Sequence, residues 1–408
     1  MQQYSFIIMI GLMVLVLWLF MWRPEAKRRK QMQAFRDGLK KGDKVYYNNR
    51  GKNIYLIRVG SDDVKTSGIR IVASHIDSPR LDFKQVPLYE SDGVALGKTH
   101  YYGGIKKYQW TTIPLALHGA VVLGDGSKVE VKIGEDEGDP VFYISDLLPH
   151  LSQKQNTKTL AEAFSGEDLN IWLGNIPYTA AKEDGDKTVK ENLLHILNEK
   201  YGIKEEDFLS AELSLVPAFK ARDIGFDRAL IGAYGHDDRV CSYPAFSALF
   251  DTETDGKTVM VVLADKEEIG SEGTTGMQCA IFTDLIDAIA YSFDTTSAVI
   301  RANSKCLSAD VNAAYDPNFK DVNEPMNSTY VSCGAGLTKF TGARGKSGSN
   351  DASAEFMAEV RKMFNDEGVI WQTGELGKVD QGGGGTVAKY IAKMNIDTVD
   401  IGVAVVSM

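Results

Sequence analysis

Several common protein signatures are missing from this chain of 408 residues. Its four cysteines, Cys241, Cys279, Cys306 and Cys333, stand far apart without a C-x-x-C pair, which excludes a zinc knuckle or disulfide framework and favours reduced, buried thiols. The chain also lacks a G-x-S-x-G nucleophile elbow, a P-loop and a dinucleotide-binding fingerprint after a strand. Positive charge is scarce, since 45 Lys and Arg face 55 Asp and Glu, and the net charge of -10 argues against nucleic acid as a partner.

The N-terminal segment differs from the rest of the chain because its first 22 residues carry no charge. Residues 6–22 form an apolar run (FIIMIGLMVLVLWLFMW), whose 17 residues meet the lower limit for crossing a bilayer. No basic region precedes the run and no small-residue cleavage site follows it, so a secretory signal is excluded. The basic cluster at 23–30 predicts a transmembrane helix with its N-terminus outside and the remaining chain in the cytoplasm. A buried core helix is the alternative, which the uniform apolarity disfavours.

From residue 44 onward the pattern is that of an α/β protein. We expect a membrane anchor with a basic juxtamembrane helix (1–43), an α/β domain in two parts (44–88 and 228–408), and a turn-rich, charged insertion between them (89–227). Strands are predicted at 45–47, 54–59, 69–74, 258–263 and 298–301, and helices at 243–251, 284–293, 353–366 and 386–394.

Two adjacent carboxylates, Glu267 and Glu268, follow the apolar strand predicted at 258–263. Neighbouring side chains in a strand point to opposite faces, so the pair shares a pocket only if the loop kinks. Two carboxylates at the end of a buried strand suit metal-assisted hydrolysis, in which one binds the ion and the other takes a proton from water. A solvated acidic turn is the simpler alternative.

Further candidate ligands follow other predicted strands. His75 and Asp77 form an H-x-D pair on an extended segment, where Asp77 can orient the imidazole. Asp237 and Asp238 could cap a helix, or either carboxylate could bridge two ions. Asp310 follows another short apolar strand. Each has an ordinary structural explanation, but α/β sheets bind ligands where strands end, so their shared location predicts a hydrolytic metal site.

The glycine run at 382–385 precedes a predicted helix and could cradle a phosphate. No Lys-Ser pair follows it, so the pattern favours close backbone packing beside a substrate instead.

Five segments occur in an order that resembles a known family: ASHIDSPRLD (73–82), GHDDRV (235–240), DKEEIGS (265–271), SADVNAAYDPN (308–318) and GGGGT (382–386). They are similar to the motifs of the aspartyl aminopeptidase and aminopeptidase I family of dinuclear zinc exopeptidases. The resemblance runs from about residue 44 to 408. It implies a zinc-exopeptidase-like mixed sheet flanked by helices, with an inserted β-rich dimerisation domain.

The resemblance also assigns roles to individual residues of this chain. His75 and Asp310 would hold one Zn²⁺, Glu268 would hold a second, and Asp237 would bridge the two. Glu267 would be the general base.

The same resemblance implies further contacts. Asp77 would orient the histidine, and His150 would reach the active site of a neighbouring subunit. Gly384 and Gly385 are expected to contact the substrate because of their place in the glycine run. Family members form dimers that assemble into dodecamers, so a homo-oligomer is expected.

The chain departs from the family pattern at both ends. A histidine ligand for the second zinc is expected next after Met408; without it Glu268 and Asp237 remain, fewer than the three protein ligands usual in catalytic zinc sites, and reduced activity is expected. Residues 1–44 instead resemble YajC, a small accessory subunit of the bacterial preprotein translocase, and the two resemblances meet at residues 41–45.

The sequence therefore predicts a metal-dependent aminopeptidase on a single-span anchor, with the catalytic body in the cytoplasm. Acidic first residues suit the aspartyl branch, whereas YYNNRGK and GGIKKYQW resemble the bacterial aminopeptidase I branch, so the preferred first residue stays open. Two alternatives remain: a translocase-associated membrane protein with an inert peptidase-like domain, and a binding module with a vestigial metal site.

Overall fold

The computed structural model describes residues 38–179, 188–251, 253 and 255–407. The chain divides into two compact units: one comprises the residues before Ser78 and after His236, and the other is Ser78–His236. The insertion predicted at 89–227 lies inside the second unit, whose limits are about ten residues wider at each end.

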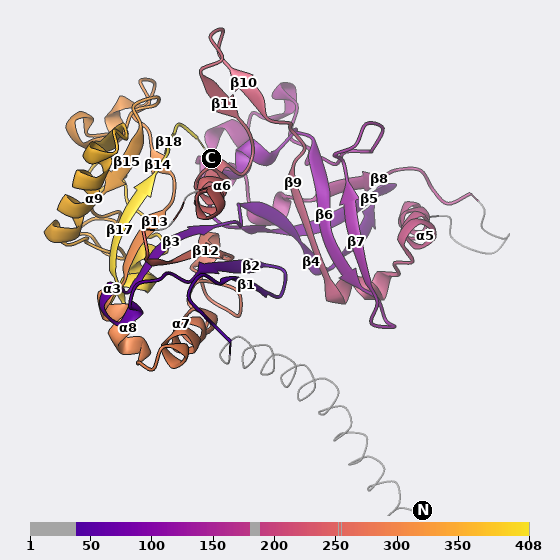
Figure 1. Ribbon diagram of the computed structural model, residues 1–408. Helices are drawn as coiled ribbons and strands as arrows, with labels where there is room; N and C mark the ends of the chain where they lie inside the picture. The colour runs from indigo at the N-terminus through magenta and orange to yellow at the C-terminus, as the bar shows by residue number, and fades with distance from the viewer. Residues whose placement is uncertain (1–37, 180–187, 252, 254, 408) are drawn as a thin grey trace, which may run out of the picture. The chain divides into compact units, whose positions relative to one another are not determined.

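The first unit is built on a mixed eight-stranded sheet, as the sequence predicts (Figure 1). In spatial order its strands are β1 (Lys44–Asn49), β2 (Asn53–Arg58), β12 (Thr258–Ala264), β3 (Ile69–His75), β13 (Lys305–Ala309), β17 (Asp397–Gly402), β15 (Ala335–Thr338) and β16 (Trp371–Thr373). Its helices are α3 (Val64–Ser67), α6 (His236–Asp251), α7 (Ile281–Ser292), α8 (Ser297–Asn303), α9 (Ala354–Asp366) and α10 (Ala388–Ala392).

The centre of this sheet is parallel, with β12, β3, β13 and β17 running in the same direction. These strands are buried, and apolar side chains such as Tyr55, Ile71, Met260 and Phe282 form one core cluster. Because both faces of these strands are buried, their sequences are continuous apolar runs and do not alternate between apolar and polar residues. Because parallel strands end at the same edge, the residues that follow β12, β3 and β13 are brought together.

The second unit has its own antiparallel sheet and core. The spatial order of its strands is β7 (Lys128–Ile133), β6 (Leu115–Val122), β9 (Ala211–Pro217), β4 (Arg80–Ser91), β5 (Val94–Tyr102) and β8 (Ile171–Gly174). Leu81, Leu115, Ile171 and Leu215 are fully buried in its core. The unit also contains the helices α4 (Leu160–Ala163) and α5 (Val189–Tyr201) and a small hairpin of β10 (Arg222–Ile224) and β11 (Leu230–Gly232).

One predicted element is wrong: residues 298–301 belong to helix α8 and not to a strand. Thr296 caps this helix by accepting a hydrogen bond from the Val299 amide, and Ile300 is buried. A short apolar run does not distinguish a strand from a buried helix. Here the N-cap at Thr296 favours the helix. Among the cysteines, Cys333 is exposed, contrary to the expectation that all four thiols are buried.

The predicted transmembrane span at 6–22 and the YajC-like segment up to residue 37 lie outside the described residues. Within the part of the chain that the structure describes, none of the helices has the length and apolarity needed to cross a membrane.

Candidate active site

Three predicted ligands meet at the edge where the parallel strands end. His75 is the last residue of β3, Asp310 directly follows β13, and Asp237 lies in the first turn of α6, at a non-helical position. The His75 Nε2 atom lies 2.9 Å from Asp237 Oδ1 and 3.8 Å from Asp310 Oδ1. One ligand atom from each residue lies within 4.8 Å of the other two.

This donor set fits a divalent cation. Tetrahedral zinc with bonds of about 2.0–2.1 Å places its ligand atoms about 3.3 Å apart, close to the spacings that His75 makes with the two aspartates. Glu268 adds a further indication, since its Oε1 atom is buried and has no hydrogen-bond partner among the described residues. A buried carboxylate oxygen without a partner is costly, and a cation would satisfy it.

The structure separates Asp237 from Asp238, which the sequence left as alternatives. Asp237 lines the cavity described below and contacts His75. Asp238 is fully buried and is not among the residues that line this cavity. Burial raises the pKa of Asp238 to about 8. The geometry therefore presents the carboxylate of Asp237, and not that of Asp238, to the cavity.

Asp77 links the histidine to the glutamate pair. The Nδ1 atom of His75 lies 3.0 Å from the Asp77 backbone carbonyl oxygen and 3.3 Å from Asp77 Oδ1, and the other ring nitrogen faces the aspartates. The backbone amides of Glu267 and Glu268 donate hydrogen bonds to Asp77 Oδ1 and Oδ2, at 3.1 and 3.2 Å. Asp77 thus contacts the imidazole through its backbone carbonyl and its carboxylate, and the same carboxylate holds the turn that carries the two glutamates.

The loop after β12 kinks. Two neighbouring glutamates can share one pocket only if the backbone between them bends in this way. Lys266 has a φ of 66°, in the left-handed region, and Glu267–Ile269 form a 3-10 turn that ends at Gly270, with a φ of 97°. Both glutamates consequently line the same cavity. Tyr390 supports the turn by donating a hydrogen bond to the Gly270 carbonyl at 2.9 Å.

Burial and the neighbouring carboxylates shift the pKa values of these groups. Burial raises the pKa of Glu267 to about 8, and the charge of Asp310 adds to the effect. Burial also raises the pKa of Glu268 to about 8, followed by the charge of Asp237. Burial alone lowers the pKa of His75, but hydrogen bonds to the surrounding carboxylates outweigh it and raise that pKa well above its usual range. A bound cation would offset the repulsion among these carboxylates.

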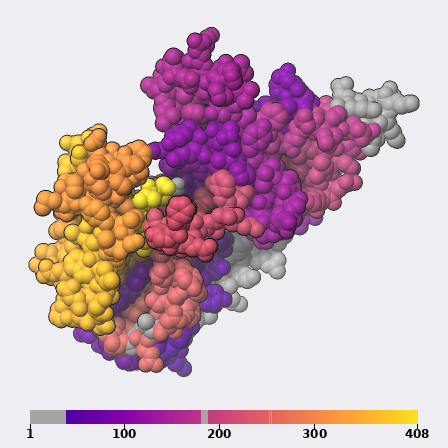
Figure 2. Space-filling view, turned by 90° about the horizontal axis from the view of Figure 1, so that it is seen from above, coloured from indigo at the N-terminus to yellow at the C-terminus, as the bar shows by residue number. Residues whose placement is uncertain are grey.

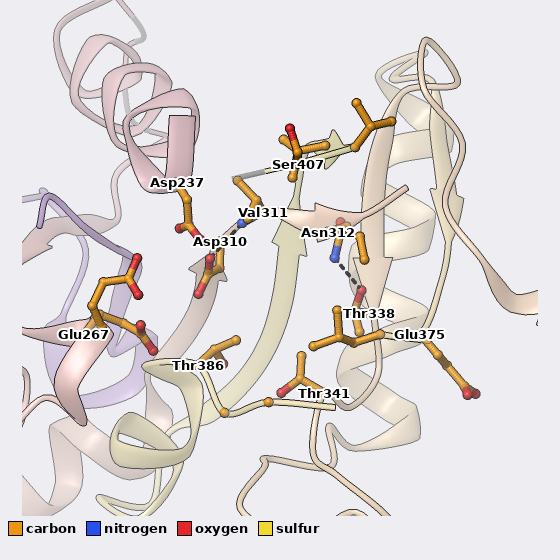
Figure 3. Close-up of a pocket in the computed structure, with 17 residues that line it drawn as sticks. Asp237, Glu267, Asp310, Val311, Asn312, Thr338, Thr341, Glu375, Thr386 and Ser407 are labelled. Atoms are coloured by element: carbon orange, nitrogen blue, oxygen red, sulfur yellow. Dashed lines mark hydrogen bonds between the residues drawn. The ribbon is translucent and has the colours of Figure 1, made fainter. Parts of the chain in front are cut away.

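A cavity of about 400 Å³ opens beside the cluster. Figure 3 shows Asp237, Glu267 and Asp310 directed toward one another on one side, with Thr338 and Thr341 on the other side and Thr386 between. The yellow residues near the end of the chain lie at the surface beside the orange part of the same unit (Figure 2), and Val405, Val406 and Ser407 line the cavity. Its other lining residues are Glu268, Val311, Asn312, Ala313, Glu375, Leu376, Gly384 and Gly385.

The glycine run packs closely, as predicted. A Cβ atom on Gly382 would lie 1.8 Å from the Leu376 carbonyl oxygen, and one on Gly383, whose φ is 115°, would lie 2.4 Å from Ala343 Cα. No residue with a side chain fits such positions, so the run can lie against its neighbours while Gly384 and Gly385 face the cavity.

Some site residues were not predicted from sequence. Thr338, Thr341, Glu375 and Leu376 lie on strand ends and loops with no motif of their own, and only the fold brings them to the cavity. His150, a predicted substrate contact, is exposed on the short 3-10 turn Pro149–Leu151 of the second unit.

Comparison with known proteins identifies the family. The sequence profile described as "Aminopeptidase I zinc metalloprotease (M18)" matches residues 24–408. The match begins 20 residues before the expected boundary at 44, and residues 24–43 therefore fall within the family region.

Similar proteins agree with this match. A probable M18 family aminopeptidase 1 of Clostridium acetobutylicum is 51% identical over 374 residues, covering 91% of this chain and 80% of that protein. One from Thermotoga maritima is 49% identical over 369 residues, covering 89% and 80%. The crystal structure of a Thermotoga maritima M18 aminopeptidase superposes with a TM-score of 0.85 at 45% identity, covering 93% and 86%.

A more distant structure, described as an S. cerevisiae mApe1 dodecamer, shares the fold with a TM-score of 0.69 at 22% identity, covering 90% of this chain and 80% of that one. These matches do not favour the alternative of a translocase protein with an inert domain. The chain belongs to the aminopeptidase I zinc metalloprotease (M18) family and is a metal-dependent aminopeptidase.

Proposed function

We propose that this chain removes the first residue of peptides at the cluster of His75, Asp237, Glu268 and Asp310. His75 and Asp310 would hold one zinc ion, Glu268 a second, and Asp237 would bridge the two. The meeting of one imidazole and two carboxylates within 4.8 Å of one another, at the edge where parallel strands end, carries this proposal. Zinc supplies Lewis-acid chemistry that activates water and polarises a carbonyl at neutral pH.

Glu267 is the proposed general base. It lines the cavity beside the proposed ligands, and its carboxylate is one of those directed toward the cluster (Figure 3). A carboxylate at this position can accept the proton of the attacking water and then give it to the departing amine. The hydrogen bond from its backbone amide to Asp77 fixes the turn, so the carboxylate keeps its place relative to His75.

The peptide itself would lie along the glycine run. Gly384 and Gly385 line the cavity without side chains, which leaves room for a peptide backbone to approach. The free α-amine would be held near the carboxylates, which favour a positive charge. Val406 and Ser407 line this same cavity.

The second unit is proposed as a dimerisation domain, with His150 reaching the active site of a neighbouring copy. Its separate core and the exposure of His150 support this role, as does the dodecamer of the distant yeast relative. Sedimentation measurements on the full chain test the assembly. An His150→Ala variant that assembles normally but loses turnover would support a contribution of His150 across subunits.

Membrane attachment through residues 1–23 is a separate proposal, with the enzyme on the cytoplasmic side. It is supported by the apolar run at 6–22 and the basic cluster behind it. Fractionation of cells that express either the full chain or a variant lacking residues 1–23 tests this proposal. If the segment attaches the enzyme to the membrane, the full chain sediments with washed membranes and the shortened variant does not.

Hydrolysis of a leucyl anilide by the purified full chain tests the central proposal. The expected result is turnover that a chelator removes and zinc restores, with bound zinc measured by elemental analysis. His75→Ala and Asp310→Asn should each lower the zinc content, whereas Glu267→Gln should retain it. Turnover that persists in the chelated protein would refute the metal mechanism.

A further inference from the structure

Helix α10 connects two parts of the proposed active site. At its N-terminal side it follows the glycine run, in which Gly384 and Gly385 line the cavity. From within the helix, Tyr390 donates a hydrogen bond to the carbonyl of Gly270 at 2.9 Å, at the end of the turn that carries Glu267. The place proposed for the peptide and the proposed general base are therefore joined through one helix of five residues.

Apolar packing alone does not determine where this helix lies. Val387, Ala388 and Ile391 are buried, and they hold the helix against the core of the first unit. Apolar contacts have no preferred direction, however, and a helix of five residues has too few internal hydrogen bonds to be stable by itself. We therefore expect directional hydrogen bonds on its two sides to set its position.

Asp400 provides the hydrogen bond at the start of the helix. It belongs to β17 and is 3% exposed, and its Oδ1 atom accepts a hydrogen bond from the Thr386 hydroxyl at 2.7 Å. The same hydroxyl accepts a hydrogen bond from the Ala388 amide at 3.3 Å, in the first turn of α10. One threonine side chain thus links a buried strand of the sheet to the start of the helix.

The burial of Asp400 requires an explanation, because the proposed mechanism does not use this carboxylate. Burial raises its pKa to about 7, and its Oδ2 atom has no hydrogen-bond partner among the described residues. The Ser308 hydroxyl, opposite Asp400 in the strand register, lowers that pKa but forms no hydrogen bond of normal geometry. A buried carboxylate is costly, and the hydrogen bond from Thr386 gives this one a structural purpose.

Tyr390 provides the hydrogen bond on the other side. Its ring is buried in the core cluster, so the hydroxyl is held in place where it reaches the Gly270 carbonyl. Gln278 Nε2 donates to the same carbonyl at 3.0 Å. Gly270 ends the 3-10 turn of Glu267–Ile269, so a displacement of Tyr390 would also displace the end of this turn.

We propose that Asp400, Thr386 and Tyr390 are positioning residues that hold α10 on both sides. They fix the glycine run relative to the proposed general base, Glu267. The inference rests on the peptidase function proposed above and adds residues that act through the backbones of the glycine run and the glutamate turn. A peptide on the glycine run is attacked efficiently only if this relative position is kept, since a misplacement of about 1 Å can cost about 100-fold in rate.

Two substitutions that each remove one hydroxyl and keep the side-chain shape test the inference. For the zinc-loaded full chain and a leucyl anilide, Thr386→Val and Tyr390→Phe should each lower kcat about five- to tenfold, the effect of one hydrogen bond. KM should change by less than about twofold, because the lost bond aligns the reacting groups and does not bind the substrate. Elemental analysis should show the zinc content of the wild type in both variants.

Conservative variants separate the position of the hydrogen bond from the charge of the carboxylate. Thr386→Ser keeps the hydroxyl, and Asp400→Asn keeps an acceptor oxygen but removes the charge, so both should retain most of the wild-type kcat. Asp400→Ala removes the acceptor and should match Thr386→Val. If Asp400→Asn loses as much as Asp400→Ala, the charge and not the hydrogen bond matters, and the inference is overturned.

The matched controls are Thr258→Val and Tyr55→Phe, the same changes at other buried positions of the first unit. Thr258 Oγ1 accepts a hydrogen bond from the Gly60 amide at 3.0 Å, at the start of β12, and the Tyr55 hydroxyl lies 3.7 Å from Cys279 Sγ. Both controls should lower the melting temperature without lowering kcat. Equal losses of kcat in controls and test variants would overturn the positioning role.

The remaining outcomes separate this inference from the proposed function. Melting temperatures identify a variant that fails to fold; if Asp400→Ala does so, Thr386→Val and Tyr390→Phe decide. A raised KM with unchanged kcat in Thr386→Val would mean that the hydroxyl contacts the substrate directly, against the inference. Unchanged kcat in both variants would overturn the positioning role and leave the peptidase function intact. Absence of chelator-sensitive turnover in the wild type would refute the peptidase function itself.

Discussion

Asp207 in the second unit and the carboxylate cluster in the first unit are buried under different conditions. In the second unit, Asp207 is 5% exposed and both its oxygens are satisfied, by the Gly124 amide at 3.0 Å and the Lys204 amide at 2.8 Å. In the first unit, Glu268 has a buried oxygen with no partner among the described residues. Asp310 is held beside other carboxylates, and burial raises its pKa.

This difference distinguishes a buried carboxylate that stabilises the fold from buried carboxylates that serve a function. A carboxylate that accepts two backbone hydrogen bonds stabilises the fold around it. A group of carboxylates that repel one another destabilises the unit that contains them, and such an arrangement persists in proteins where a cation or a reaction requires it. The first unit is thus expected to respond to zinc, and the second is not.

The largest expected effect comes from Glu267→Gln. Removal of a general base costs about 10²–10⁴-fold in rate, so kcat should fall by this factor. Zinc content should remain that of the wild type, because Glu267 is not a proposed ligand. Steady-state kinetics with elemental analysis measure both quantities. A variant that keeps more than a tenth of the wild-type kcat would show that another group takes the proton.

Asp77→Asn sharpens the comparison within the first unit. The substitution keeps the side-chain shape but weakens the support of both His75 and the glutamate turn. Loss of a group that orients a metal ligand typically costs 10–100-fold in metal affinity or activity, and we expect about this range. Zinc titration in a competing chelator measures the affinity. Unchanged affinity and turnover would mean that Asp77 does not position these groups.

Asp207→Ala is the corresponding change in the second unit. It removes both hydrogen bonds that the buried carboxylate accepts from the Gly124 and Lys204 amides, so the free energy of unfolding should fall by about 1–3 kcal/mol. Chemical denaturation measures this loss. Zinc affinity should not change, and a parallel loss of zinc affinity would contradict the division between the two kinds of buried carboxylate.

The smallest expected effect is on how the stability of the chelator-treated, zinc-free protein depends on pH. The pKa of Glu267 and that of Glu268 are raised to about 8, so the folded state binds more protons than the unfolded state between about pH 4.5 and 8. Stability of the chelated protein should therefore decrease as the pH rises through this window. Thermal unfolding at several pH values tests the sign, and the zinc-loaded protein is the control, since a cation offsets the repulsion. A rise in stability with pH in the chelated protein would contradict the charge cluster.

Much of the first unit could be predicted from sequence. Buried parallel strands appear as apolar runs, and the side chains after them, His75, Glu267, Glu268 and Asp310, were identified because the ends of such strands converge. The residue pattern by itself did not choose between Asp237 and Asp238, although the family resemblance named Asp237, because the choice depends on a local backbone that departs from helical geometry.

The side of the cavity that faces the acidic cluster could not be predicted for a different reason. Thr338 ends β15, Leu376 follows β16, and Val405 belongs to β18 (Ala404–Val405), which pairs with β14 (Asn312–Ala313). These segments meet only through the order of the strands in the sheet, and threonine or leucine at a strand end carries no distinguishing signal. Composition and spacing therefore reveal the acidic residues of the cavity but not the residues that face them.

Anomalous X-ray scattering at the zinc edge, from crystals grown with zinc, tests the central claim most directly. The account predicts a strong peak within about 2.3 Å of His75 Nε2 and of carboxylate oxygens of Asp237 and Asp310, the normal range of zinc–ligand bonds. Crystals that bind zinc only elsewhere, with no peak among these three side chains, would contradict it.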